Sequence, residues 1–143
     1  MPIQRIFEEV EAAKAHIENL SVQALAAELR EHPDLLLLDI RELQERILLG
    51  SIPGAKHVPR GMLEFWADPS SPYARNYFAQ DRRTVLFCAG GGRSALAART
   101  LQEMGFSNIA HLEAGFAGWQ ESGESIEDVR SASRWVERTP ATS

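Results

Sequence analysis

The residues best suited to chemistry lie in one short stretch around the only cysteine of the chain. Cys88 follows the largely β-branched and aromatic run 84–87, and three glycines and then Arg93 come after it. A cysteine at the carboxyl end of a buried strand lies where open α/β sheets place their ligand sites. The glycines allow backbone N–H groups to turn inward around an anion, and a helix that begins near Ser94 adds the positive end of its dipole. With the cation of Arg93, these features favour the nucleophilic thiolate form of Cys88.

The spacing between the cysteine and the arginine separates two kinds of chemistry. A phosphatase-type loop has one more residue between them and holds a tetrahedral oxyanion, whereas here four residues separate Cys88 from Arg93. The smaller ring of N–H groups suits the outer sulfur of a persulfide better than a whole phosphate. We therefore predict that Cys88 carries sulfur. The residues expected to bind that sulfur or its donor are Ala89, Gly90, Gly91, Gly92 and Arg93.

The elements that must position this loop follow from the hydrophobic pattern. Apolar residues between Ile3 and Ile17 recur at helical spacing and predict an amphipathic N-terminal helix. Strands are predicted at 35–39, 56–58, 84–88 and 109–112, and helices or helical turns at 21–30, 41–48, 61–66, 94–104 and 116–121. We expect a loop at 67–83, with at most a short helix around 73–79. The alternation of strands and helices predicts an α/β domain with a mostly parallel sheet.

Composition limits the class of protein. The chain has 143 residues, of which 44% are hydrophobic and 24% charged, as expected for one globular domain. No apolar run approaches the ~20 residues of a membrane span, and the charges within residues 1–14 argue against a signal peptide. The net charge of −5 argues against nucleic-acid or membrane partners. A lone cysteine excludes an internal disulfide and favours the cytoplasm. The four histidines, at positions 16, 32, 57 and 111, have no metal-ligand spacing, so no metal is expected.

Four stretches, in this order, resemble the rhodanese-like single-domain sulfurtransferases. They are 36–42, with a strand that ends in Asp-x-Arg, 50–59, the loop 88–93, and 112–123. The sequence departs from the family pattern at Ser51, where histidine is common, and at Ala114, which replaces a frequent glycine. The resemblance implies a central, mainly parallel five-stranded sheet with helices on both faces, Cys88 as the sulfur carrier, and no cofactor. We expect Asp39 to pair with an arginine or with backbone N–H groups and to support the loop from beneath.

We divide the chain into an N-terminal amphipathic helix (1–18), a rhodanese-like domain (19–123) and a polar C-terminal extension (124–143). In the extension, only four side chains could dock on the body: Ile126, Val129, Trp135 and Val136. The expected partners are a small-molecule or protein sulfur donor and an acceptor, and the two terminal segments leave room for a homodimer. Selectivity is expected from a rim at 60–66 and 67–83.

Three functions remain open from the sequence. The first is a thiosulfate sulfurtransferase that moves sulfane sulfur to cyanide or a thiol through a Cys88 persulfide. The second is a phosphatase or arsenate-reductase-like enzyme, in which Cys88 and Arg93 bind an oxyanion and Asp68 or Asp81 serves as the general acid. The third is a non-catalytic interaction module with a rhodanese fold.

Overall fold

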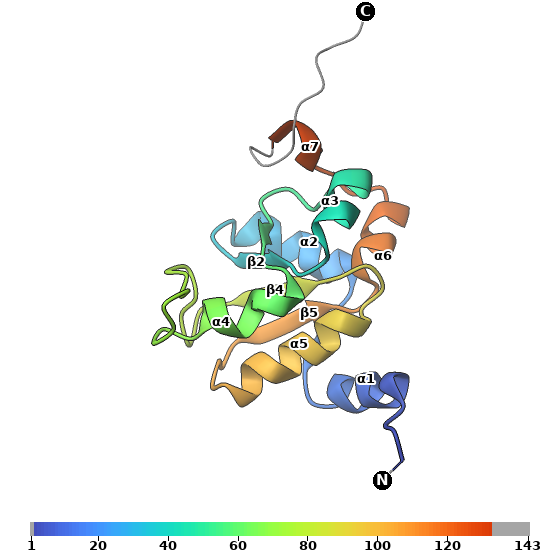
Figure 1. Cartoon of the computed structure of the whole chain (residues 1–143). Coiled ribbons are helices and arrows are strands. Elements are labelled where there is room, and N and C mark those ends of the chain that lie inside the picture. Colours follow the sequence, from blue (N-terminus) through green and yellow to red (C-terminus); the bar gives the residue numbers. More distant parts are fainter. Residues whose placement is uncertain (1, 133–143) are drawn as a thin grey trace, which may run out of the picture.

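A five-stranded sheet lies at the centre of the molecule, as Figure 1 shows for the computed structural model, which describes residues 2–132. The strand order is β1-β5-β4-β2-β3, and all neighbouring strands pair in parallel. The bounds of the strands are β1 (Glu18–Leu20), β2 (Leu36–Asp39), β3 (Lys56–His57), β4 (Thr84–Phe87) and β5 (Ile109–Leu112). The fold class predicted from the sequence, an α/β protein with a five-stranded, mainly parallel sheet, is confirmed.

Helices cover both faces of this sheet. Their bounds are α1 (Ile6–Lys14), α2 (Val22–Glu31), α3 (Leu43–Leu49), the 3₁₀ turn η1 (Arg60–Met62), α4 (Leu63–Ala67), α5 (Gly92–Glu103), α6 (Gly115–Glu121) and α7 (Val129–Ala132). One apolar cluster joins one face of the sheet to α1, α4 and α5, and a second joins the other face to α2 and α6. Alternate residues of β4 belong to the two clusters: Leu86 faces α5, and Phe87 faces α6.

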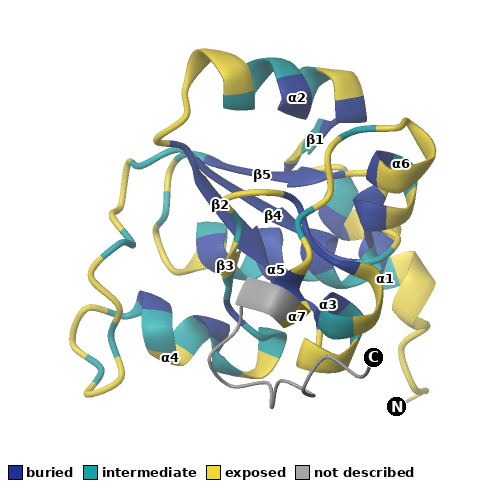
Figure 2. Cartoon of the chain, turned by 90° about the horizontal axis from the view of Figure 1, so that it is seen from above, coloured by how far each residue is buried: buried dark blue, intermediate teal, exposed yellow. Residues whose placement is uncertain are grey.

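The central strands are buried on both faces, which is why their sequences are apolar throughout (Figure 2). Asp39, the last residue of β2, pairs with Phe87, the last residue of β4, so the two strands end at the same edge of the sheet. The helix predicted from Ser21 is also confirmed, because the Ser21 side chain accepts a hydrogen bond from the Ala24 N–H at 3.0 Å and caps α2.

The N-terminal segment differs from its prediction in two ways. The helix ends at Lys14, and Ile17 leads into β1, a short edge strand that the sequence analysis did not identify. Three residues with one apolar position give too little pattern to reveal such a strand. The expected apolar face is only partly covered, since Val10 is buried whereas Ile6 and Phe7 are exposed.

The loop expected at 67–83 is confirmed for residues 73–79, which contain turns and no helix. One further segment differs from its prediction. Helix α5 begins at Gly92, two residues before the predicted start at Ser94, because Gly91 already takes the N-cap position with a φ of 97°.

The start of the C-terminal extension docks on the body. Ser51 and Glu127 form an antiparallel β-bridge, and Val129 is buried. Trp135 and Val136 lie outside the described residues, and the division at 18/19 and 123/124 stays a prediction. Between residues 2 and 132, no helix is both long and apolar enough to cross a membrane.

Candidate active site

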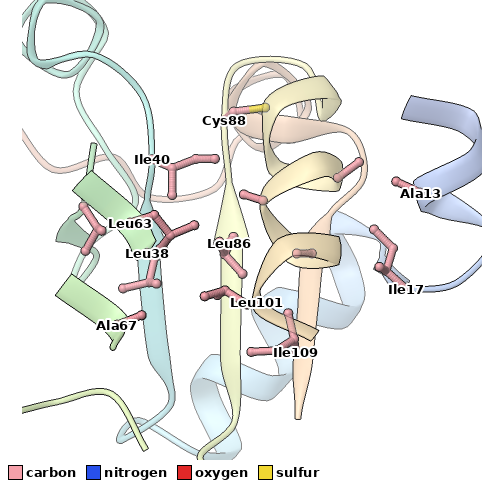
Figure 3. Close-up of a cluster of buried hydrophobic side chains, with 14 of the residues drawn as sticks. Ala13, Ile17, Leu38, Ile40, Leu63, Ala67, Leu86, Cys88, Leu101 and Ile109 are labelled. Carbon is pink, nitrogen blue, oxygen red and sulfur yellow. The ribbon is translucent and has the colours of Figure 1, made fainter. Parts of the chain in front are cut away.

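Cys88 lies directly after β4 at the carboxyl edge of the sheet. Its side chain turns toward α5, as Figure 3 shows, and the residue is 1% exposed. The backbone N–H of Gly91 donates to Sγ at 3.1 Å, and the N–H of Ser94 points to the same sulfur at 3.4 Å. Two donors from the first turn of a helix and its cap can stabilise negative charge on this sulfur.

Close backbone contacts fix the shape of the loop. Gly91 and Gly115 both have positive φ values, 97° and 67°. A Cβ at Gly91 would overlap the Glu113 carbonyl, and one at Gly115 would overlap the Ala89 carbonyl. The N–H groups at the start of α6 also hold the loop, because Phe116 donates to the Cys88 carbonyl at 2.8 Å. The loop is therefore clamped between α5 and α6.

The loop residues predicted from the sequence take different positions. Gly91 donates to the sulfur. Ala89 instead accepts a hydrogen bond through its carbonyl, from the N–H of Ala117 at 3.1 Å. The remaining three, Gly90, Gly92 and Arg93, line the pocket above Cys88.

Arg93 is not a free cation beside the sulfur. Both of its terminal nitrogens donate to the carboxylate of Glu45 in α3, each at 2.8 Å. The hydrogen bonds from Arg93 are the main reason that the pKa of Glu45 falls to about 2, so this carboxylate is ionised at neutral pH. The sequence analysis did not anticipate this partner, which lies 48 residues away in the chain.

Ser94 connects Cys88 to the buried His111, one of the four histidines for which the sequence predicts no role as a metal ligand. The Ser94 hydroxyl oxygen lies 3.5 Å from Sγ and 2.8 Å from Nδ1 of His111, and His111 Nε2 lies 2.7 Å from Oδ1 of Asn19. The amide nitrogen of Asn19 donates to the carbonyls of Lys14 and Ile17, so Oδ1 is left to accept from His111.

These hydrogen bonds determine which atoms of Asn19, His111 and Ser94 donate and which accept. Burial lowers the pKa of His111 to about 4, so the ring is neutral at pH 7. With Nε2 donating to Asn19, Nδ1 must accept, and the Ser94 hydroxyl donates to it. The Ser94 oxygen then faces Sγ as an acceptor for the Cys88 thiol proton. The one feature of the sequence that pointed to this contact was the position of His111 within the strand predicted at 109–112.

Asp39, which ends β2 beside Phe87 of β4, confirms the expected pairing with arginine. Its carboxylate accepts hydrogen bonds from Arg41 at 2.9 and 3.0 Å, from Arg46 at 3.0 Å and from the Ser51 hydroxyl at 2.8 Å. Burial alone would raise the pKa of Asp39, but the hydrogen bonds and charge of Arg41 outweigh it, and the pKa is lowered. Ser51, a departure from the family pattern, thus has a structural partner.

Arg41 joins this cluster to the loop. Its side chain is completely buried, although arginine is usually exposed. Its guanidinium lies 4.3 Å from the ring centroid of Phe116, the residue whose N–H holds the Cys88 carbonyl. Arg41 also donates to the Gly50 carbonyl at 2.7 Å.

A pocket of about 350 Å³ opens above Cys88. Its lining residues are Ile6, Phe7 and Val10 of α1, Leu96, Arg93 and Gly92 of α5, and Gly90 and Cys88 of the loop. Neither segment of the predicted rim, 60–66 or 67–83, contributes a lining residue to this pocket. Part of the second segment lines a separate pocket with Met104 and Phe106. Within residues 2–132, no cluster of three or more histidine, cysteine or acidic side chains could hold a metal ion.

Comparison with known proteins identifies the family of this chain. The model of the rhodanese-like domain matches residues 21–122. The chain belongs to the rhodanese-like domain family. YtwF of Bacillus subtilis, whose name suggests a sulfurtransferase, is one of the curated relatives of this rhodanese-like chain. It is 29% identical to the chain over 104 residues. The chain spans 91% of the length of YtwF but about half (51%) of another B. subtilis relative, YrkF.

Solved structures also resemble this rhodanese-like chain. A Rhodopseudomonas palustris protein of unknown function, described as a possible tyrosine phosphatase, is 43% identical, with a TM-score of 0.83 over 89% of this chain and 99% of its own. The polysulfide-sulfur transferase homodimer of Wolinella succinogenes is 34% identical, with a TM-score of 0.68 over 83% and 84%. The thiosulfate sulfurtransferase of Pseudomonas aeruginosa is 28% identical, with a TM-score of 0.69 over 85% of this chain and 22% of its own. The family, together with the Wolinella and Pseudomonas structures, supports a sulfurtransferase-type function.

Proposed function

We propose that the protein is a sulfurtransferase in which Cys88 carries the sulfur as a persulfide. The observation that carries this proposal is the position of Sγ, at the end of β4, where the N–H groups of Gly91 and Ser94 converge on it. The Cys88 thiolate attacks the outer sulfur of a donor such as thiosulfate. A bond between the two sulfurs forms, the S–S bond of thiosulfate breaks, and sulfite leaves with the electron pair. An acceptor, cyanide or a thiol, then removes the outer sulfur and restores the thiolate.

The surroundings of the sulfur support this cycle. The two N–H groups are held in place by the helix and by the contacts of Gly91, so they need no rearrangement when charge develops on the persulfide. The Ser94 hydroxyl donates to His111, so its oxygen can accept a hydrogen bond from Cys88 whenever the sulfur is protonated. The cycle requires neither a metal nor an organic cofactor.

We place the reaction in the cytoplasm, where a lone cysteine stays reduced. We also propose that a homodimer is accessible to this chain, as it is to the Wolinella relative.

A phosphatase is the second candidate, because the Rhodopseudomonas relative is described as a possible tyrosine phosphatase. Such an enzyme requires a carboxylic acid beside the leaving group. The described residues that line the Cys88 pocket include no carboxylic acid. Asp68 accepts hydrogen bonds from the N–H and hydroxyl of Ser70 near α4, and Asp81 precedes β4 at the strand end opposite Cys88. Sulfur transfer is therefore the better supported function.

The test is the mass of the protein after incubation with thiosulfate. We expect wild-type protein to gain one sulfur atom and to lose it as thiocyanate when cyanide is added. Cys88→Ser should gain none while keeping the wild-type unfolding temperature. Hydrolysis of an aryl phosphate by wild-type protein, with no sulfur on Cys88, would support the second candidate instead. If neither reaction occurs, the fold serves as an interaction module.

A further inference from the structure

The mouth of the Cys88 pocket is apolar on the side of α1. Helix α5 lies between the sheet and α1 (Figure 1), and Val10 of α1 stands beside the loop, since a Cβ built at Gly92 would lie 3.9 Å from its Cγ2. Ile6 and Phe7 continue this face outward and stay 57% and 77% exposed. On the other side, Leu96 of α5 lines the same pocket. Apolar side chains thus surround the approach to a reactive sulfur.

The cation of this pocket is already paired. Arg93 is the only basic side chain among the described lining residues, and Glu45 occupies both of its terminal nitrogens. A thiosulfate dianion that enters must lose water without gaining a free cation, which is costly. A donor with less charge and an apolar tail would instead bury that tail against α1 and gain free energy from it.

We propose that this pocket selects sulfane-sulfur donors with an apolar leaving group, such as an aromatic thiosulfonate, over inorganic thiosulfate. Phe7 and Ile6 are the specificity-determining residues. This inference rests on the proposed role of Cys88 as sulfur carrier. The pocket of about 350 Å³ has room for a phenyl ring, because a cavity of about 150 Å³ already binds benzene.

The reaction balances with such a donor. In a thiosulfonate, R–SO₂–S⁻, the outer sulfur is the one transferred. The Cys88 thiolate forms a bond to it, the bond between the two donor sulfurs breaks, and the sulfinate R–SO₂⁻ leaves with the electron pair. Two negative charges enter and two remain, one on the sulfinate and one on the persulfide. The tail R takes no part in the chemistry, so any effect of R through α1 measures binding.

The experiment compares kcat/KM for benzenethiosulfonate and methanethiosulfonate, with cyanide as acceptor. These donors share their charge and reacting group and differ in the tail. We expect Phe7→Ala to lower the ratio of phenyl to methyl donor at least fivefold. Phe65→Ala is the matched control, because Phe65 on α4 is also an exposed ring, 56% accessible, but lies outside the pocket. It should leave the ratio unchanged. Both variants should keep the wild-type unfolding temperature, since both rings are exposed.

Three outcomes would overturn the inference. The first is an unchanged ratio in Phe7→Ala. The second is wild-type kcat/KM for thiosulfate equal to that for benzenethiosulfonate. The third is an equal loss with all donors in Phe7→Ala, which would mean that α1 only supports the loop. In each case a mass gain of one sulfur on Cys88 leaves the proposed function intact. If Cys88 gains no sulfur from any of the three donors, the proposed function itself fails.

Discussion

Cys88 is buried, yet two N–H groups, those of Gly91 and Ser94, point to its sulfur on one side. A buried thiolate without donors would be costly, so these contacts are a condition for nucleophilic chemistry at this position. The nearest fixed cation, Arg93, contributes less than its sequence position suggests, because its charge is paired with Glu45. At the scale of residues, the positive charge available at the site therefore depends on the ion pair between Arg93 of α5 and Glu45 of α3.

Two substitutions in this pair should change the use of thiosulfate in opposite directions. Glu45→Gln keeps an acceptor for the backbone of Glu42 but removes the negative charge, so Arg93 becomes available to the dianion. We expect kcat/KM for thiosulfate to rise about threefold to tenfold, whereas Arg93→Ala should lower it by a similar factor. The measurement is steady-state cyanolysis. Equal losses in both variants would mean that the pair acts only as a brace between α3 and α5.

At the scale of elements, the loop depends on the connection between β5 and α6 as much as on its own glycines. The Glu113 carbonyl fills the space where a Cβ at Gly91 would lie, and the N–H groups of Phe116 and Ala117 hold the carbonyls of Cys88 and Ala89. The three glycines are consequently unequal. Gly91 is required by its φ and by this contact, whereas Gly90 faces open space.

Alanine substitutions at Gly91 and Gly90 should differ in their effect on the free energy of unfolding. Gly91→Ala introduces both a strained backbone and an overlap with main-chain atoms that cannot give way, so we expect it to lower the free energy of unfolding by about 2–4 kcal/mol. Gly90→Ala, the matched control, should stay within about 0.5 kcal/mol of wild type. Urea unfolding measures both. Similar stabilities of the two variants would show that the loop moves away from Glu113 with little strain.

At the scale of the whole molecule, the pKa values of four buried or half-buried titratable groups shift in the same direction. Burial lowers the pKa of His57 and of His111, and hydrogen-bonded arginines lower the pKa of Asp39 and Glu45. In each case the unfolded chain binds protons more readily than the folded chain. Stability is therefore lost as the pH falls, first through the histidines below their ordinary value of 6.5 and then through the carboxylates.

His111 gives the clearest test of this pH dependence. Its pKa falls from 6.5 to about 4 on folding, so its contribution is complete above pH 6.5 and is lost progressively toward pH 4. Between pH 7 and 4.5, wild-type protein should lose about 2 kcal/mol more unfolding free energy than His111→Gln. Urea unfolding at several pH values measures the difference. Parallel pH profiles for the two proteins would contradict a neutral buried His111.

The sequence by itself determined the features that depend on near neighbours. Strands β2 and β4 could be predicted because an apolar run buried on both faces is a local pattern, and the cap of α2 follows from Ser21. The order of motifs along the chain also carried the family resemblance, and with it Cys88 as the candidate sulfur carrier.

Only the tertiary structure decided which distant groups meet at the sulfur. Glu45 reaches Arg93 across 48 residues, and His111 reaches Asn19 across 92. Neither pair leaves a periodic signal, because polar contacts between separate elements depend on how those elements pack and not on the spacing within either one. The same reason applies to α1. Its apolar residues predicted a helix, but only its packing against α5 showed that Phe7 lines the pocket of Cys88.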